Sequence, residues 1–399
     1  MTKAFFGLPD NVEFCRRCVI SNQRPSSTVE FKHTSSERKA TIGFEDGICD
    51  ACRYHDIKEV SIDWQDRESR LLRVLEQHRS NDMRYDVIVP GSGGKDSAFT
   101  SHILKYKYGM NPLTVTWAPH RYTDIGWENF QNWIDVGGHD NILFTPNGRL
   151  HRHLTRLAFL NLLHPFQPFI IGQRIIGPLM AQKFGVKLVM YGENQAEYGN
   201  NPDDNQSPLM DQKFFSTKDP REIILGGASI GTLIDEGQYR MQDFAPYIPP
   251  DASALEQSGV KVHYLGFYLK WDPQECFYYA SEHTGFKANT VRTEGTYSKY
   301  SSIDDKIDPF HYYTTLIKFG IGRASYDAAQ EIRNGKITRE EGVHLVHKYD
   351  QEFPQRYFNE FLDYVGVTEP QFVEAIDRFR SPHLWEHRGN LWLLKHQVS

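Results

Sequence analysis

The sequence predicts an α/β protein built on a doubly wound parallel sheet. Short strand-like segments alternate with helical stretches between residues 85 and 192, and these strands are almost wholly apolar. A glycine-rich loop directly follows the first of them. Strands without a polar face are typical of parallel sheets covered by helices on both sides. In such folds ligands bind beyond the carboxyl ends of the strands, which is where this loop is expected to lie.

The expected elements follow from apolar periodicity and length. Strands are predicted at 85–90, 113–117, 141–145, 187–192 and 261–271, and helices at 63–80, 96–108, 125–136, 150–163 and 172–184. Residues 195–260, rich in Asn, Asp, Gly and Pro, are interpreted as a long insertion or lid, and the chain beyond Pro309 as helical. We therefore expect an N-terminal cysteine module (1–60), an α/β domain (61–300) with an insertion at about 195–260, and a helical C-terminal region (301–399).

Composition narrows the class of protein. The 399 residues, 39% of them hydrophobic, are sufficient for a sizeable core, and no apolar run reaches the ~18 residues of a membrane span. The first residues, "MTKAFFGLPDNVEF", do not resemble a secretory signal, so a cytoplasmic location and no membrane partner are expected. A net charge of −6 makes a nucleic-acid partner unlikely, because phosphate binding requires clustered Lys and Arg.

The loop after the first strand reads "PGSGGKDS" over residues 90–97. A Walker A loop requires Ser or Thr after its Gly-Lys pair, but Asp96 stands there, and Val89 occupies the position of its first glycine. The dinucleotide fingerprint also fails, because Asp96 replaces its third glycine. The remaining interpretations are an anion-binding loop of another kind and a plain glycine-rich turn.

Physical chemistry favours the anion-binding interpretation. Backbone N–H groups freed by the glycines, two serine hydroxyls and the N-terminus of the next helix form a nest for pyrophosphate. A carboxylate in such a nest requires a cation, so Asp96 is predicted to bind Mg²⁺. The residues predicted to form this anion site are Pro90, Gly91, Ser92, Gly93, Gly94, Lys95, Asp96 and Ser97.

The pattern S-G-G-x-D-S at residues 92–97 resembles the PP-loop of the ATP pyrophosphatase superfamily. This resemblance implies that a substrate oxygen attacks the α-phosphate of ATP, that pyrophosphate leaves, and that a nucleophile then displaces AMP. It leaves open which carbonyl is activated and which nucleophile arrives.

Four of the five cysteines form two C-x-x-C pairs, Cys15 with Cys18 and Cys49 with Cys52. This spacing is typical of thiolates around a tetrahedral ion, and the long gap between the pairs fits a zinc ribbon with structural Zn²⁺. An iron–sulfur cluster or a redox pair is the alternative. Cys276 stands alone and is expected to be a buried core thiol.

The chain contains no recognisable source of ammonia. A glutaminase with an N-terminal nucleophile needs cysteine as the first mature residue, where Thr2 stands, and Cys276 lacks the glycine-flanked turn of a triad glutaminase. Ammonia derived from glutamine would therefore require a partner subunit.

The chain as a whole resembles the N-acetyl sugar amidotransferases of bacterial lipopolysaccharide and O-antigen biosynthesis. The similarity lies in "FCRRCV", "GICDACR", "VPGSGGKDS", "MYGENQAEYG" and "RTEGTYSKYSSIDDKIDPFHYYTTLIKFGIGR". It implies an ATP-dependent carbon–nitrogen ligase that adenylylates an acetamido carbonyl of an N-acetylated sugar or sugar nucleotide, and replaces its oxygen with ammonia to give an acetamidino group. It also implies two partners similar to the glutaminase and cyclase subunits of imidazole glycerol phosphate synthase.

Further site residues are predicted around this chemistry. By analogy with late basic residues in related branches, Lys306 and Arg323 are expected to stabilise the phosphates, with solvated surface charge as the alternative. Glu193 and Asn194 follow a strand and are expected to bind substrate or an ion, or else to cap a turn. One further acidic residue is expected to complete the Mg²⁺ shell unless the group is a solvated face; the candidates are Glu294, Asp304 and Asp305.

Two other classes remain open at this stage. A PP-loop tRNA-modifying thiolase would use the same loop with a catalytic cysteine near it and would favour a basic surface. A non-enzymatic scaffold that retains the loop is disfavoured by the intact Asp96 and Ser97.

Overall fold

The computed structural model describes residues 3–37, 39–200, 206–389 and 391–399. Its centre is a five-stranded parallel sheet. The strand order is β5 (Asp140–Phe144), β4 (Pro112–Trp117), β3 (Val87–Pro90), β6 (Leu188–Tyr191) and β9 (Lys261–Tyr264). This arrangement confirms the predicted doubly wound α/β sheet.

The central strands are buried on both faces because their residues are almost wholly apolar. All six residues of β4 are buried, and Val87, Ile88 and Val89 of β3 have no exposed surface. Successive strands are added outward on one side of β3 up to β5, and then on its other side from β6. The order therefore reverses between β3 and β6, and a crevice is expected beyond the carboxyl ends of these two strands.

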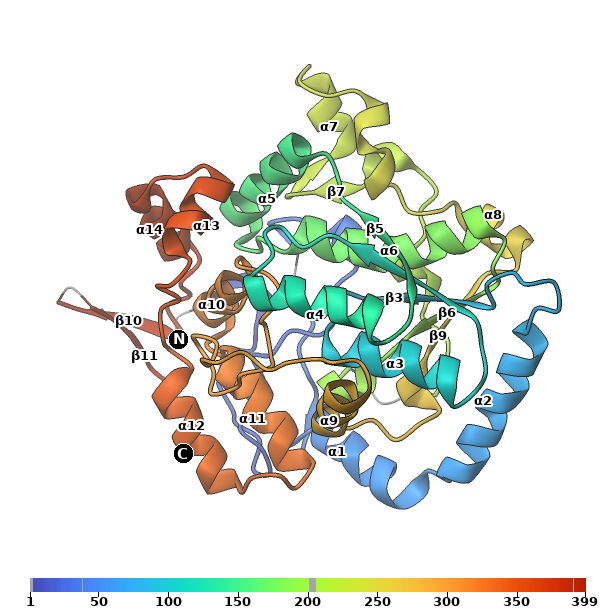
Figure 1. The fold of residues 1–399 in the computed structure, drawn as a ribbon. Coiled ribbons are helices and arrows are strands. Elements are labelled where there is room, and N and C mark those ends of the chain that lie inside the picture. Colours follow the sequence, from blue (N-terminus) through green and yellow to red (C-terminus); the bar gives the residue numbers. More distant parts are fainter. Residues whose placement is uncertain (1–2, 38, 201–205, 390) are drawn as a thin grey trace.

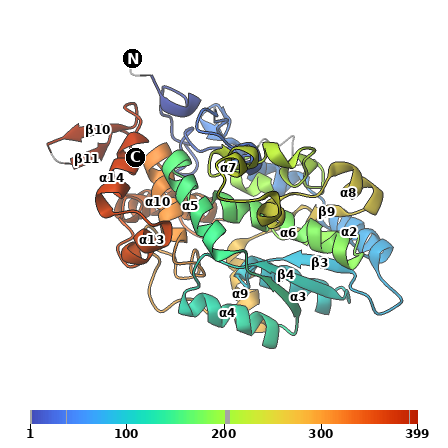
Figure 2. The same ribbon diagram turned by 90° about the horizontal axis from the view of Figure 1, so that it is seen from above.

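Helices cover both faces of the sheet (Figures 1 and 2). Helices α3 (Lys95–Tyr106) and α4 (Asp124–Asp135) lie on one face, where α9 (Pro273–His283) packs on α3. On the other face α6 (Gln167–Phe184) crosses β3 and β4, and α5 (Gly148–Leu162) connects β5 to it. The predicted helices are all present, including α2 (Trp64–His78), which the Asp63 side chain caps.

The predicted strand 261–271 is too long. Strand β9 ends at Tyr264, and the chain then turns through a 3-10 helix, Leu265–Phe267. The reason lies at Gly266, whose N–H donates to the Gly192 carbonyl at 2.8 Å. A Cβ there would lie only 3.1 Å from the backbone nitrogen of Asn194, so this glycine lets the turn pass close under the end of β6.

The segment between β6 and β9 contains its own structure. It holds α7 (Ile230–Asp235), α8 (Ala252–Ser258) and a short hairpin of β7 (Ile224–Leu225) and β8 (Ala228–Ser229). Four of its aromatic side chains are buried in the main core: Phe214, Phe215, Phe244 and Tyr247. Residues 201–205 of the predicted insertion lie outside the described residues.

The C-terminal region is helical, as predicted, and its core is continuous with that of the α/β sheet. Phe361 and Phe372 pack against Phe159 of α5 with ring centroids 5.3 and 5.4 Å apart. A final hairpin that the sequence did not reveal, β10 (Trp385–Arg388) with β11 (Leu391–Leu394), projects at the left of Figure 1. The helices are α10 (Asp308–Phe319), α11 (Arg323–Arg333), α12 (Arg339–Tyr349), α13 (Phe358–Val365) and α14 (Glu369–Arg378).

The N-terminal cysteine module packs against this helical region. It contains a two-residue hairpin, β1 (Phe44–Glu45) with β2 (Ile48–Cys49), followed by α1 (Asp50–Asp56). Its four cysteines share a core with Ala328 and Ala329 of α11 and Val346 of α12. The two ends of the chain therefore support each other.

None of the helices in the described ranges is both long and apolar enough to cross a bilayer.

The contact between α6 and β4 gives a test of this packing. A Cβ at Gly172 would lie 2.2 Å from the Trp117 ring, so Gly172→Ala is expected to push α6 off the sheet and to destabilise the fold by about 1–3 kcal/mol. At Gly148, in the first turn of α5, a Cβ meets no atom within 4 Å, and Gly148→Ala is the matched control. Thermal unfolding followed by circular dichroism should show a lower Tm for the first variant only, and equal Tm values would contradict the close approach.

Candidate active site

The glycine-rich loop lies at the carboxyl end of β3, where the strand order reverses. Gly93 has a φ of +82°, and a Cβ there would lie 2.8 Å from Cα of Phe130 in α4. Gly91 is equally restricted, because its Cβ would meet that of Ser97 at 2.1 Å. Glycine is therefore required at both positions by close packing.

The loop backbone is open to an anion. Within the described part of the chain, the N–H groups of Ser92, Gly93 and Gly94 donate to no protein acceptor, and α3 begins directly after them at Lys95. Unpaired N–H groups at a helix N-terminus carry partial positive charge and bind phosphate. The Ser97 hydroxyl is less available to an anion than its position in the loop suggested, because it donates to the Gly94 carbonyl at 3.0 Å.

Three hollows meet at this loop, and each is bordered by Asp96, Glu193 and Tyr312. The strand-end hollow, about 550 Å³, extends from the loop toward Val115 and Trp117 at the end of β4 and Ile176 of α6. The loop hollow, about 370 Å³, lies between the loop and residues 300–308. The α11 hollow, about 310 Å³, is bounded by α11 and the start of α9. One site thus combines an apolar wall with two polar chambers.

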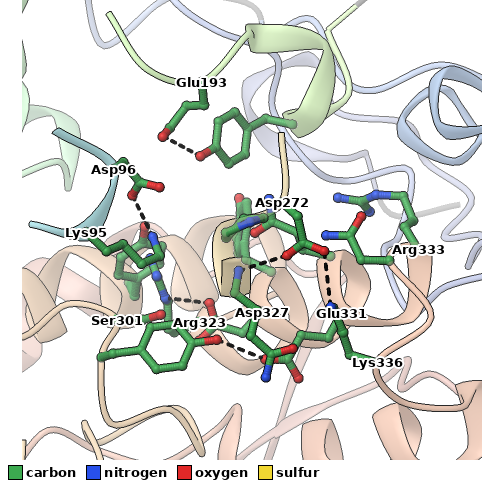
Figure 3. Close-up of a pocket in the computed structure, with 18 of the residues that line it drawn as sticks. Lys95, Asp96, Glu193, Asp272, Ser301, Arg323, Asp327, Glu331, Arg333 and Lys336 are labelled. Atoms are coloured by element: carbon green, nitrogen blue, oxygen red, sulfur yellow. Dashed lines mark hydrogen bonds and ion pairs between the residues drawn. The ribbon is translucent and has the colours of Figure 1, made fainter. Parts of the chain in front are cut away.

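Carboxylates crowd the point where the hollows meet. Asp96 Oδ2 accepts from Lys95 Nζ at 2.5 Å, whereas its buried Oδ1 has no partner among the described atoms. Glu193 accepts from the Tyr198 hydroxyl (Figure 3). Burial, and then the nearby Asp96 charge, raise the pKa of Glu193 to about 7. Two carboxylates in one enclosed place, one of which has an unpartnered oxygen, fit a divalent cation.

Arg323 enters the same region from the first turn of α11. Its Nε lies 3.1 Å from Asp327 Oδ1, one helical turn later, and its guanidinium stands 4.4 Å from the Tyr312 ring centroid. Asp308, at the start of α10, faces the same loop hollow, and burial raises its pKa to about 7. A fixed guanidinium beside the loop is suited to charge that develops on phosphate.

The α11 hollow is lined mainly by paired charges and tyrosines (Figure 3). Lys336 Nζ lies 3.4 Å from Asp272 and 3.0 Å from Glu275, and Tyr297, behind the hollow, donates to Glu331 at 2.8 Å. Such a wall of donors and acceptors suits a hydroxylated substrate more than an apolar one.

The structure brings together only part of the predicted site. Asp96, Glu193 and Arg323 border the junction of the hollows, and Asp304 borders the loop hollow together with Ser92. Asn194 is buried and caps the following 3-10 helix, accepting from Ala196 N at 3.2 Å, as the alternative interpretation had it.

Three other predicted residues have different surroundings. Asp305 also borders the loop hollow, but its carboxylate accepts from the backbone N–H and the Nδ1 of His120, both at 2.7 Å. It therefore holds the segment around Asp305 against the segment that follows β4. Glu294 accepts from the backbone N–H of Arg356 at 3.0 Å. Lys306 lies away from the junction, 3.9 Å from Glu360 and 5.4 Å from the Tyr357 ring centroid.

Sequence reasoning missed several residues of the junction. Tyr198, Asp308 and Tyr312 border it and lie in segments that carry the family resemblance, but no site role was predicted for them. Asp327 also borders it and lies in a stretch interpreted only as helix. One available signal was the spacing of Arg323 and Asp327, since an i, i+4 pair of opposite charges shares one helix face.

Comparison with known proteins finds a match for the C-terminal region of the chain, which contributes residues to this site. Residues 294–398 match the family model described as "LPS biosynthesis protein WbpG-like, C-terminal domain". This part of the chain is therefore similar to that domain, and we call residues 294–398 the WbpG-like domain. This match supports the expected link to lipopolysaccharide biosynthesis, and the domain supplies Asp304, Asp308, Arg323 and Asp327 to the site.

Other comparisons are more distant. An NMN synthetase from Francisella tularensis aligns with 11% identity over 75% of this chain and 97% of its own, at a TM-score of 0.31. An NAD⁺ synthetase from Burkholderia pseudomallei aligns with 15% identity over 59% of this chain and 96% of its own, at a TM-score of 0.24. No curated protein matches the sequence. The fold is therefore assigned from the sheet topology described above.

The four N-terminal cysteines form a separate, closed cluster behind the WbpG-like domain. All four are fully buried and their Sγ atoms lie within 4.8 Å of one another, with Cys15 to Cys52 at 3.8 Å and Cys18 to Cys49 at 3.7 Å. Thiolates at ~2.3 Å from a tetrahedral zinc ion are roughly 3.8 Å apart, so the geometry is compatible with zinc. A tetrahedral ion held by all four thiolates would have no open coordination position for a substrate.

Asp350 holds α11, and with it Arg323, in place. Its carboxylate accepts from the N–H groups of Gly322 and Ser325 and from the Ser325 hydroxyl, each at 2.8 Å. Asp350→Ala leaves both buried N–H groups unpaired, which costs about 1–3 kcal/mol each, and should therefore lower the free energy of unfolding measured by denaturant titration. The exposed Glu340→Ala is the control.

The pH dependence of unfolding checks this role of Asp350. Burial raises the pKa of Asp350 from 3.8 to about 6, so the folded state holds a proton that the unfolded state releases between these values. The contribution of Asp350 to stability therefore decreases as the pH rises from about 4 to 6. Denaturant unfolding of Asp350→Ala should lack this part of the slope, and an unchanged pH profile would argue against the buried carboxyl.

Proposed function

We propose that the protein is an ATP-dependent amidotransferase that converts an acetamido group of an N-acetylated sugar into an acetamidino group. The observation that carries the proposal is the open backbone of residues 92–94 at the strand-order reversal, beside the unpaired Asp96 Oδ1. The WbpG-like domain, which supplies Arg323 to the same junction, supports lipopolysaccharide sugars as the substrate class.

ATP is proposed to lie along the strand-end hollow. Its adenosine fits against Val115, Trp117 and Ile176, and its phosphates reach the N–H groups of the loop. Asp96 and Glu193 would hold Mg²⁺, which when bound spreads the phosphate charge and relieves the repulsion between the two carboxylates. Arg323 supplies further positive charge beside the loop.

The sugar is proposed to occupy the α11 hollow, whose tyrosine and carboxylate side chains suit hydroxyl groups. Its acetamido oxygen attacks the α-phosphorus of ATP, and the bond to the β-phosphate oxygen breaks, which releases pyrophosphate. Ammonia then adds to the carbon of the O-adenylyl imidate and loses a proton, and AMP leaves with the original oxygen. Adenylylation turns a poor leaving group into a good one, so two accessible steps replace one difficult step.

Ammonia is proposed to come from a glutaminase and a cyclase-like partner. High ammonium should bypass both, which allows the chain to be tested alone.

A tRNA-modifying thiolase is less well supported. Four of the cysteines are enclosed in the cluster, and Cys276 in α9 is 2% exposed, with burial raising the pKa of its thiol well above the ordinary value. A buried thiol with a raised pKa is a poor nucleophile at neutral pH.

The reaction can be tested with purified protein, ATP, Mg²⁺, high ammonium and a panel of diacetamido sugars. We expect AMP and pyrophosphate only when a sugar is present, together with the sugar mass change of O replaced by NH. Asp96→Asn should lower turnover about 100-fold or more, as for loss of a group that stabilises transition-state charge, whereas the exposed Asp82→Asn should not. AMP release that requires bulk tRNA instead of sugar would refute the proposal.

Structural zinc is proposed for the cysteine cluster. Elemental analysis should find one zinc per chain, retained in Cys276→Ala and lost in Cys49→Ser. Loss of the ion should lower Tm by roughly 3–4 °C, the shift for a loss of about 3 kcal/mol in a chain of 399 residues, because the cluster supports α11. Iron in place of zinc, or a metal-free protein of unchanged Tm, would contradict this assignment.

A further inference from the structure

A fourth hollow of about 200 Å³ lies next to the proposed substrate sites. It is formed by residues 24–33 and Lys39 of the N-terminal module, by His164 and Arg174, and by Lys318 of α10. Arg174 and Tyr198 border both this hollow and the strand-end hollow, and Arg24 and Tyr326 border both it and the α11 hollow. We call it the basic hollow, because Arg24, Lys39, Arg174 and Lys318 line it.

Lys318 is the most enclosed of these cations, at 4% exposed. Its ammonium donates to the Leu162 carbonyl at 2.7 Å and lies 5.2 to 5.7 Å from the ring centroids of Phe6, Phe319 and Phe379. Burial lowers its pKa to about 7. No carboxylate of the described chain forms an ion pair with it.

Arg24 and Arg174, which also line the basic hollow, lack an ion-pair partner among the described residues as well. Arg24 is 5% exposed and stands 4.8 Å from the Tyr326 ring centroid, and Arg174 donates to the Thr28 carbonyl at 2.8 Å. Neither forms an ion pair within the part of the chain that the structure describes. Arg24 and Lys318 are buried, and Arg174 is partly buried. A buried cation without an ion-pair partner is costly, so these three cations around one hollow favour an anionic ligand.

The acidic groups at the hollow do not remove this excess of positive charge. Glu30 lies between His33 Nδ1 and His164 Nε2, 3.3 Å from each, and Glu37 pairs with Lys39 at 3.1 Å. Glu30, His33 and His164 have the spacing of a metal site, but the surrounding cations oppose a divalent ion. The electrostatics therefore favour an anionic ligand.

We propose that the basic hollow binds the anionic group of the acceptor sugar. Its chemistry suits a diphosphate, as in a nucleotide-linked sugar, or the carboxylate of a uronic acid, since guanidinium groups bind both in the same forked geometry. That the anion belongs to the acceptor rests on the proposed function. Arg24, shared with the α11 hollow, would then connect the anionic group to the sugar ring.

Binding can be measured without turnover. The strand-end hollow is first saturated with α,β-methylene-ATP and Mg²⁺, and UDP, uridine and an N-acetylated uronic acid are then titrated by calorimetry into the full chain. Lys318→Met removes the charge but keeps an unbranched side chain beside the three phenylalanine rings, so the fold should be retained. Lys348→Met, at an exposed position of α12, is the matched control.

We expect the wild type and Lys348→Met to bind UDP or the uronic acid, and Lys318→Met to bind the same anion about tenfold or more weakly. Preference for UDP over uridine identifies the diphosphate, and binding of the uronic acid identifies the carboxylate. Equal binding of both anions to the wild type and Lys318→Met, or no binding of either, overturns the inference. If binding depends on Lys318 but no N-acetylated sugar yields AMP, the amidotransferase proposal fails and the anion site stands.

Discussion

The site depends on a loop backbone that is held open, because the N–H groups of residues 92–94 donate to no acceptor among the described residues. The loop cannot relax into an ordinary helix start, because Gly93 lies against the backbone of Phe130 and Gly91 lies against Ser97. Opposite it, Gly126 of α4 allows the backbone of Asp304 to approach, where a Cβ would lie 2.5 Å from its Cα. Three glycines therefore fix the distance between the loop and the WbpG-like domain, and the unpaired donors are retained for a ligand.

Helix α11 connects the site to the N-terminal cysteine module. One of its faces places Arg323 and Asp327 at the junction of the hollows, and another packs Ala328 and Ala329 against the cysteine cluster. Arg333, at its end, donates to the Glu197 carbonyl in the segment after β6. The cysteine module thus has a structural role, because it packs against the helix that carries Arg323, and its four thiols are buried.

Charge is distributed unevenly over the connected hollows. Asp96 and Glu193 concentrate negative charge at the loop, which suits a divalent cation, whereas Arg24, Arg174 and Lys318 concentrate positive charge at the other end. A substrate that spans this gradient meets fixed charges of both signs, and such preorganised charges bind without reorganisation during the reaction. Under the proposed function, specificity for the acceptor sugar is therefore expected to arise from the N-terminal segment as much as from the glycine-rich loop.

The sequence by itself determined the sheet, because apolar strands of four to six residues have no alternative to burial on both faces, and it determined the loop, because glycine spacing is a local property. The cysteine spacing likewise predicted a cluster that the structure assembles. Only the tertiary structure decided which late residues face the loop: Lys306 and Asp308 are two positions apart, yet only Asp308 borders the hollows. It also brought Arg24 to Lys318, since the packing of one chain end on the other depends on contacts between distant segments, which no local pattern records.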